Sequence, residues 1–561
     1  MNRRSFYILL SVIFFIVAAT AQEYEATYHL ISRSYTLNED GSMDYRYRKE
    51  LQLFTTASFD KYGETFIVYN PEYQTLTINE AYTVRKDGSI VKTPDNAFNP
   101  SLPYSCTDCE RFNPLREMVV THTALEYDAT IVLDYTIHTQ QPFLPSLMER
   151  IDLYEDAPVD HYEIAVTVPK DLNLYHNLNW QKYTSQKHAV ADAVESTEGN
   201  VRKLQWRFDN LEQKTAESYL PHNELPYLMF TTFDSPTTFM SDFTMQNAFM
   251  PAPANLYDAV LKPIMDKDAS PMEKVIAIRD YVHDNIHTNA LPIRYMAYVV
   301  ASPYMVWSTN CGTPVEKNLL LESMLRTAGF NARFGLLYSH LMDNPESLLR
   351  LDMDGQTFYI SAASKSQLSM DVSRTNDSFI DKNGNVFNFQ SESLKVKREV
   401  GVNLAKSEDK LVPDVTVKSE EIVSPMKRTL QQKGSGLIAE VEPLTGRYCQ
   451  LLLHDGNYGT AVRSVNLPRQ RRHPVAVVPT EEHYLYEISL PADAKWIVNP
   501  YEFHKAYPFG SITIKATVSG NKLTVLRQLT LTESVISLKD YKKFREMMMQ
   551  WDTPHPFVIQ Y

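Results

Sequence analysis

The sequence predicts a multidomain α+β protein with an N-terminal β-sandwich, a central α+β domain and a C-terminal β-rich domain. Three observations support this fold class. The chain of 561 residues is too long for one hydrophobic core, and its length suggests roughly three or four domains. Apolar and polar residues alternate over short runs in the first and last parts of the chain. The middle part instead has apolar residues at helical spacing behind capping motifs.

The first residues resemble a secretory signal peptide. Arg3 and Arg4 precede an apolar run over residues 6–19, and small residues at 19–21 form a cleavage site, so residues 1–21 are the expected signal. An uncleaved anchor is less favoured because it needs about 20 apolar residues. We therefore expect export to the periplasm, the outer-membrane surface or the extracellular space, with no transmembrane segment after signal cleavage.

Residues 22–240 are expected to form the β-sandwich. Turn signals at Asp40-Gly41 and Asp87-Gly88 separate short alternating runs, which is the spacing typical of a sandwich. The runs are residues 45–53, 66–69, 74–84, 130–137, 162–168 and 203–208.

Residues 241–400 are expected to form the α+β domain. Residues 270–273 and 313–316 each read Ser/Thr-Pro-x-Glu, a capping box with proline at the first helical position. Gly329 ends the second helix as a left-handed cap. Strand-like runs follow at residues 332–338, 348–352 and 356–360.

Residues 401–561 are expected to form a β-rich domain with a terminal helix at 538–549. Residues 400–435 are mixed, charged and weakly patterned, which indicates a linker or long loop. Alternation returns between residues 436 and 533.

Composition narrows the function classes. A net charge of −13 argues against nucleic acid as a partner, because phosphate binding needs a basic face. The 34 tyrosines suit aromatic platforms that bind glycans or peptides, although half-buried strands explain them more simply. No motif indicates a cofactor.

The four cysteines are too few for a disulfide scaffold. Cys106 and Cys109 form a single C-x-x-C in a loop without the second ligand pair that zinc needs, so a local disulfide is the favoured interpretation. Cys449 lies in an apolar strand and is expected to be buried. Cys311 lies two residues before the N-cap of a predicted helix, where the helix dipole favours a thiolate nucleophile. A structural cysteine is the alternative.

Residues 310–333 resemble the nucleophile helix of bacterial transglutaminase-like proteins. The shared features are a Cys, a Lys-containing helix, a Leu-Leu pair and an Arg-x-x-Gly sequence at the end of the helix. Residues 69–71 and 84–88 resemble the DUF3857 domain that often precedes it. The resemblance covers about residues 25–400 and implies a papain-like central fold. It also implies that active members use Cys, His and Asp.

The His and Asp expected from this resemblance are missing. The His position, before the strand that precedes Asp354-Gly355, holds Glu346 or Ser347, and the acid position holds Ser361. This departure predicts a degenerate triad. His340, with Asp343 or Asp354 to orient it, is a candidate replacement base, but a solvated loop histidine is favoured.

Several other residues can be interpreted either as functional or as structural. Trp307 is a candidate pocket wall for a substrate or a core residue. His283 and His287 are four residues apart on a helix, where a surface pair is favoured over a metal site. A basic cluster, defined as Arg469, Arg471, Arg472 and His473, is suited to gripping a carboxylate, sulfate or phosphate, or is a solvated turn.

Two functions follow. The favoured one is a pseudoenzyme that binds a peptide, protein or glycan in the cell envelope, and whether the protein is an enzyme stays open. The alternative is an active thiol peptidase or acyl transferase that acts on amide bonds through Cys311 with a relocated base. A third hypothesis is a structural envelope component, which a disulfide between Cys311 and Cys449 would support.

Overall fold

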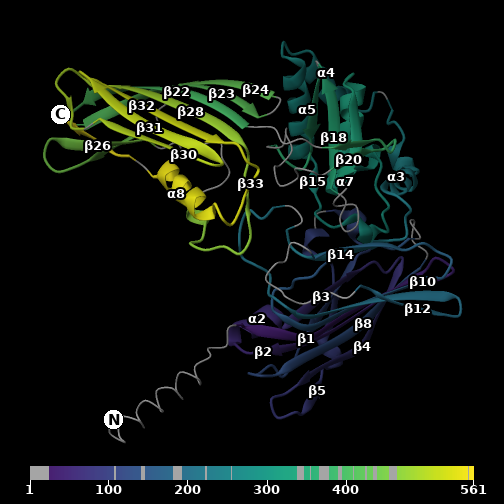
Figure 1. Ribbon diagram of the computed structural model, residues 1–561. Helices are drawn as coiled ribbons and strands as arrows, with labels where there is room; N and C mark the ends of the chain where they lie inside the picture. Colours follow the sequence, from purple (N-terminus) through teal and green to yellow (C-terminus); the bar gives the residue numbers. More distant parts are fainter. Residues whose placement is uncertain are drawn as a thin grey trace, which may run out of the picture.

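The computed structural model describes most of the chain after residue 23. The segments outside the described residues are 1–23, 107–108, 141–145, 181–191, 222–223, 254, 338–345, 354, 366–377, 389–393, 409, 424–425, 434–438, 454–463, 499 and 554. The expected signal peptide, His340, Asp343 and Asp354 all lie in these segments. Figure 1 shows three parts, which follow one another in the sequence from purple to yellow; strands dominate the first and the last, and the central part combines helices and strands.

The N-terminal part is built on an eight-stranded sheet with the strand order β12-β13-β10-β1-β2-β8-β4-β5. Its strands are β1 (Ala26–Leu37), β2 (Met43–Leu53), β4 (Gln74–Val84), β5 (Ile90–Lys92), β8 (Thr130–Thr139), β10 (Val159–Pro169), β12 (Val194–Glu198) and β13 (Val201–Leu211). The pairing is antiparallel except between β1 and β10. The central strands β1, β2 and β8 each have a hydrogen-bonded neighbour on both sides.

Two three-stranded sheets and a short helix complete the N-terminal part. One sheet has the order β3-β7-β6 and the other β11-β14-β9. Their bounds are β3 (Glu64–Tyr69), β6 (Phe98–Ser101), β7 (Arg116–Thr121), β9 (Met148–Asp152), β11 (Tyr175–Asn179) and β14 (Tyr227–Thr231), and the helix is α2 (Thr56–Tyr62). The β-rich character expected of this part is confirmed.

The alternation of β2 decides which side chains face inward. Tyr45, Tyr47 and Lys49 lie on one face because successive strand residues point to opposite sides. Arg46 and Arg48 lie on the other face, where Arg46 forms an ion pair of 2.6 Å with Asp134. The inner face therefore combines tyrosines with a lysine.

The central part packs helices on a five-stranded antiparallel sheet of order β19-β18-β17-β20-β21. The strands are β17 (Ala332–Leu337), β18 (Ser347–Met353), β19 (Gln356–Ile360), β20 (Ser378–Asp381) and β21 (Val386–Asn388). The helices are α3 (Pro236–Thr244), α4 (Asp258–Met265), α5 (Pro271–Asn285), α6 (Pro303–Thr309) and α7 (Pro314–Thr327). Both predicted capping boxes form, at the N-caps Ser270 and Thr313.

Helix α7 is the centre of this part. It contacts β17 and β18 on one side and α5 and α6 on the other. Ten of its residues are buried, including the polar Glu316, Lys317, Asn318 and Glu322. A buried polar side chain needs hydrogen-bond partners, so these residues have specific structural roles.

The C-terminal part contains a seven-stranded sheet of order β24-β23-β22-β28-β32-β31-β30. Its strands are β22 (Leu394–Ser407), β23 (Lys410–Val423), β24 (Met426–Lys433), β28 (Thr480–Ser489), β30 (Tyr501–Tyr507), β31 (Gly510–Ser519) and β32 (Lys522–Leu531). Helix α8 (Tyr541–Asp552) buries Phe544 and Trp551 in the same core. A four-stranded sheet has β25 (Ala439–Pro443), β26 (Tyr448–Leu453), β29 (Lys495–Trp496) and β34 (Phe557–Gln560).

The expectation of a linker at residues 400–435 is wrong. This segment forms most of β22 and β23, which pair with each other along their length. Val400, Val402 and Val415 are buried, whereas the charged residues Asp414 and Lys418 on the same strand as Val415 are exposed. The charged residues that alternate with the buried valines made this segment look polar, so the strands were not predicted from the sequence.

The structure supports a multidomain α+β protein rich in strands. Among the described residues, no helix is long and apolar enough to span a bilayer.

Candidate functional site

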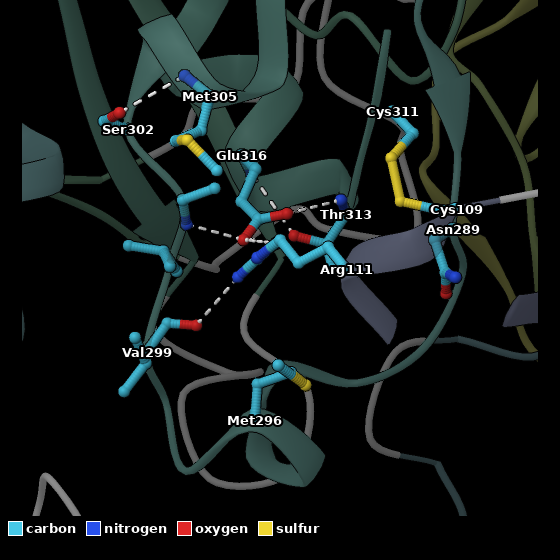
Figure 2. A network of polar contacts seen from close by, with 12 residues as sticks. Cys109, Arg111, Asn289, Met296, Val299, Ser302, Met305, Cys311, Thr313 and Glu316 are labelled. Carbon is cyan, nitrogen blue, oxygen red and sulfur yellow. Dashed lines mark hydrogen bonds and ion pairs between the residues drawn. A yellow bond between two sulfur atoms is a disulfide. The ribbon is translucent and has the colours of Figure 1, made fainter. Parts of the chain in front are cut away.

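Cys311 lies in a short strand, β16 (Cys311–Gly312), immediately before α7. Its sulfur is bonded to Cys109 of the N-terminal part, 202 residues earlier in the chain (Figure 2). Cys311 is only 3% exposed and has no free thiol in this structure. Cys106 and Cys449 are the buried free cysteines. The expected local disulfide between Cys106 and Cys109 is therefore wrong, and Cys311 does not pair with Cys449.

The disulfide joins two segments that already pack together. Cys109 stands between the short helices η2 (Tyr104–Cys106) and η3 (Glu110–Phe112). An apolar cluster surrounds it, formed by Cys106, Cys109, Phe112, Leu115, Met296 and Cys311. Asn289, which is fully buried, donates from Nδ2 to the Ser105 carbonyl at 2.8 Å. Cys109 and Cys311 are far apart in the sequence, so the C-x-x-C spacing of Cys106 and Cys109 could not indicate that Cys311 is the disulfide partner.

Glu316 links the start of α7 to the N-terminal part. Its carboxylate accepts hydrogen bonds from the Thr313 N–H at 2.8 Å and the Ala301 N–H at 2.7 Å. It also forms an ion pair with Arg111, whose guanidinium reaches the Val299 carbonyl at 3.4 Å (Figure 2). The Glu316 side chain is completely buried. The sequence identified Glu316 as a helix cap but contained no signal for Arg111.

Ser347 and Ser361, at the positions expected to hold His and Asp, both contact Asn318 of α7. The three uncharged side chains form a hydrogen-bond network. Asn318 donates from Nδ2 to Ser347 Oγ at 2.8 Å and to Ser361 Oγ at 3.2 Å. Its Oδ1 accepts the Ala362 N–H at 2.7 Å. Ser347 Oγ also lies 3.4 Å from the carbonyl of Pro314, the first residue of α7. The side chains of Asn318, Ser347 and Ser361 contain no group that can act as a general base near neutral pH.

Lys317 stabilises the packing of α7 against α5. Its Nζ donates to the Ile286 carbonyl at 2.7 Å, the His283 carbonyl at 3.3 Å and Thr288 Oγ1 at 2.8 Å. These carbonyls belong to the end of α5, where a positive charge complements the helix dipole. Burial lowers the pKa of Lys317 to about 8. The lysine of this motif thus has a structural role.

Two further candidates have partners in this structure. Trp307 packs against Tyr257 and Tyr281, with ring centroids 5.4 and 5.9 Å away, as part of the central hydrophobic core. His283 Nδ1 lies 3.0 Å from Asp284 Oδ1. Over the described ranges of the chain, no cluster of three His, Cys, Asp or Glu residues is suited to a metal ion.

The basic cluster binds a carboxylate of the chain itself. Glu217 accepts the backbone N–H groups of Arg472 at 2.7 Å and His473 at 3.1 Å. Arg471 Nε lies 3.5 Å from Glu217, and the Arg471 side chain is fully buried. Arg472 also pairs with Glu212 at 3.1 Å. The basic cluster therefore joins the C-terminal part to the end of the N-terminal part.

A cavity of about 430 Å³ lies between the inner face of the eight-stranded sheet and residues 294–298 of the central part. Its lining includes Tyr35, Tyr45, Tyr47 and Tyr135 from the sheet. Pockets that hold small ligands occupy about 300–1,000 Å³. The sequence indicated this site only through its tyrosine-rich alternating strands.

Family models match two parts of the chain. Residues 39–214 match a domain of unknown function with a solved structure, DUF3857, and residues 453–556 match a second one, DUF3858. No curated protein matches the chain.

A candidate protease from Parabacteroides distasonis has a similar structure, with 27% identity and a TM-score of 0.77 over 96% of this chain and 99% of that protein. Two other solved structures are much less similar. A candidate cysteine protease from Cytophaga hutchinsonii has 11% identity and a TM-score of 0.18 over 40% of this chain and 76% of its own. The M1 zinc metallopeptidase of Deinococcus radiodurans has 10% identity and a TM-score of 0.19 over 37% and 42%. Scores this low support no structural argument.

The resemblance to DUF3857 that residues 69–71 and 84–88 indicated is confirmed by the family model. The chain therefore contains a DUF3857 domain at residues 39–214 and a DUF3858 domain at residues 453–556, consistent with the transglutaminase-like family that it resembles.

Proposed function

We propose that this protein is an exported, catalytically degenerate relative of the transglutaminase-like enzymes that binds a peptide or glycan in the cell envelope. The observation that carries this proposal is the disulfide between Cys109 and Cys311. A sulfur in a disulfide is not a nucleophile for acyl transfer, because that chemistry needs a thiolate.

The surroundings of Cys311 support the same conclusion. Ser347 occupies the position where the resemblance predicts the His, and its Oγ contacts the carbonyl of Pro314, the first residue of α7. A thiol at that first residue would gain most from the helix dipole. Pro314 has no nucleophilic side chain, and Cys311 lies three residues before it. A Cys–His–Asp mechanism needs a base and a residue that orients it. The network of Asn318, Ser347 and Ser361 offers neither.

The cavity of the N-terminal part supports a binding role. The similar protein from Parabacteroides distasonis is a candidate protease, which supports a peptide as one ligand class for the present chain. The present chain combines a closed thiol position with a cavity of about 430 Å³ lined by tyrosines. Such a cavity suits ligand retention without turnover.

The test compares thiol reactivity in the oxidised and reduced full-length mature chain. Iodoacetamide alkylation of Cys311 would be followed by peptide mass spectrometry between about pH 5 and 9, alongside cleavage of a peptide library. Without reductant we expect no modification of Cys311 and no cleavage. After mild reduction we expect Cys311 to react like an ordinary thiol, again without cleavage.

A Cys449→Ser variant is the matched control, because Cys449 is a buried free cysteine in the C-terminal part. Rapid alkylation of reduced Cys311 below about pH 7, together with peptide cleavage, would contradict the proposal and establish the thiol enzyme. Loss of both signals in a His340→Ala variant would then identify His340 as the relocated base.

A further inference from the structure

The tyrosine-lined cavity has a regular aromatic floor. Tyr35 projects from β1, Tyr45 and Tyr47 from β2, and Tyr135 from β8. Ring centroids are 4.9 Å apart for Tyr35 and Tyr45, and 5.4 Å apart for Tyr47 and Tyr135. Burial raises the pKa of Tyr45 and Tyr47, so their phenols remain hydrogen-bond donors at neutral pH. The floor thus offers flat apolar faces with hydroxyl groups at their edges.

Two cations of the sheet lie beside this floor, and Arg294 of the central part also lines the cavity. Arg33 on β1 is directly opposite Tyr47 in the strand register, and Lys49 is the next inward residue of β2 after Tyr47. The Arg33 guanidinium pairs with Glu155 at 3.3 Å through one nitrogen, while its Nε is buried and has no hydrogen-bond partner. An unpartnered buried donor costs free energy unless a ligand satisfies it.

Lys49 is also incompletely satisfied. Lys49 is only 6% exposed, and its Nζ donates a hydrogen bond to Thr65 Oγ1 at 2.8 Å. An ammonium has three donors, and across the described residues Lys49 has no ion pair. The negative charges of Asp156 and Glu155 act on it only as secondary influences, and burial lowers its pKa to about 8. Lys49 is therefore a buried cation without a direct counter-ion.

Two acidic residues, Asp44 and Glu149, line the cavity. Asp44 pairs with His138 at 2.8 Å, and Glu149 has partners of its own. Arg33 and Lys49 carry two positive charges, and Glu155 supplies one carboxylate in direct contact with Arg33, so this end of the cavity retains positive charge that an anionic group would neutralise. Hydrogen bonds between a cation and a carboxylate are among the strongest in proteins.

The roof of the cavity is a fixed turn of the central part that follows η5 (Ile293–Met296). Ala297 and Tyr298 both have left-handed backbones, with φ of 52° and 60°. Buried Gln246 holds this turn by donating to the Tyr298 carbonyl at 2.9 Å and accepting the Val300 N–H at 3.0 Å. Strained backbone held by its surroundings is typical of ligand sites.

We propose that this cavity binds a carboxylate-bearing sugar, with its carboxylate between Arg33 and Lys49 and its ring against the tyrosine floor. This inference rests on the proposed binding function and names its ligand class. A sugar fits better than a peptide because β1, β2 and β8 are paired on both sides, so they offer no free strand edge that a peptide could extend.

The experiment measures binding of digalacturonate to the full-length mature chain by isothermal titration calorimetry at about pH 7. The dimethyl ester of digalacturonate is the neutral control ligand, and Ala-Ala-Ala is the peptide probe. We expect digalacturonate to bind at least about 10-fold more tightly than its ester, which corresponds to one charge-assisted hydrogen bond.

Two matched variants test the site. Lys49→Met removes the buried charge and should weaken digalacturonate binding at least about 10-fold, without lowering the melting temperature. Lys86→Met makes the same change at an exposed lysine outside the cavity and should leave binding unchanged.

Three outcomes would overturn the proposal: no binding of digalacturonate, equal binding of its ester, or equal binding by Lys49→Met. Binding of Ala-Ala-Ala alone, lost in Lys49→Met, would overturn the sugar and assign the cavity to a peptide carboxylate. The proposed lack of catalysis is judged separately by Cys311 alkylation, so the failure of one proposal is distinguishable from the failure of the other.

Discussion

Arg111 forms an ion pair with Glu316, the carboxylate that also completes the capping box of α7 (Figure 2). One residue of the N-terminal part therefore neutralises a fully buried charge at the start of a central helix. The disulfide between Cys109 and Cys311 holds the same two segments together covalently. The start of α7 therefore lies at a contact between the N-terminal and central parts.

The Arg111→Met substitution should destabilise the protein by about 3–5 kcal/mol, because it leaves the Glu316 carboxylate buried without its cation. Urea denaturation at neutral pH measures the free energy of unfolding. Arg85→Met is the control, since it removes an exposed ion pair with Glu126, and little change is expected there. Equal stability of Arg111→Met and wild type would show that Glu316 does not depend on Arg111.

The disulfide connectivity predicts a specific cross-linked peptide. Trypsin digestion of the unreduced protein should give one peptide containing both Cys106 and Cys109, joined to a second one containing Cys311. Reduction should separate them, and a Cys109→Ser/Cys311→Ser double variant should lose about 2–5 kcal/mol of stability. Cys449→Ser should keep the cross-link, whereas an unlinked Cys311 peptide in the oxidised protein would refute the assignment.

The Glu217→Ala substitution should weaken the junction between the N-terminal and C-terminal parts. It removes the acceptor of two backbone N–H groups and the partner of the buried Arg471, at a cost of about 2–4 kcal/mol. Differential scanning calorimetry should show a lower transition temperature. Glu212→Ala, which loses a more exposed pair with Arg472, should change it little. Equal effects of both variants would mean that the junction does not depend on Glu217.

Stability should fall in acid partly through His122. Burial, reinforced by the charge of Lys49, lowers its pKa from 6.5 to about 3. The unfolded chain therefore binds a proton below about pH 6.5 that the folded protein accepts only near pH 3. The stability contributed by neutral His122 is complete above about pH 6.5 and is lost as the pH falls to about 3.

Urea denaturation of wild type and His122→Gln at about pH 7.5 and 5 tests this linkage. Wild type should lose about 2 kcal/mol more than the variant between these pH values. His504→Gln, which changes an exposed histidine, should behave like wild type. A parallel decline of wild type and His122→Gln would show that His122 is protonated in the folded protein.

The sequence by itself determined the features that neighbouring residues decide. Both capping boxes, at Ser270 and Thr313, were identified because each consists of a side chain and a backbone N–H three residues apart. The resemblance placed Ser347 and Ser361 where its active members have a His and an Asp, and both side chains contact Asn318 of α7. The alternation over residues 45–53 identified a strand, which the structure has as β2.

Only the tertiary structure decided how distant segments combine. Cys109 bonds Cys311 across 202 residues, although the nearby Cys106 was the expected partner. Lys49 had no sequence signal, because its importance comes from the cavity that β1, β3 and the turn after η5 enclose. Residues 400–435 include most of the paired strands β22 and β23, although their charged residues had indicated a linker or long loop. Local patterns specify hydrogen bonds within a few residues, whereas disulfide partners, buried charges and cavities depend on packing between segments that the sequence does not place side by side.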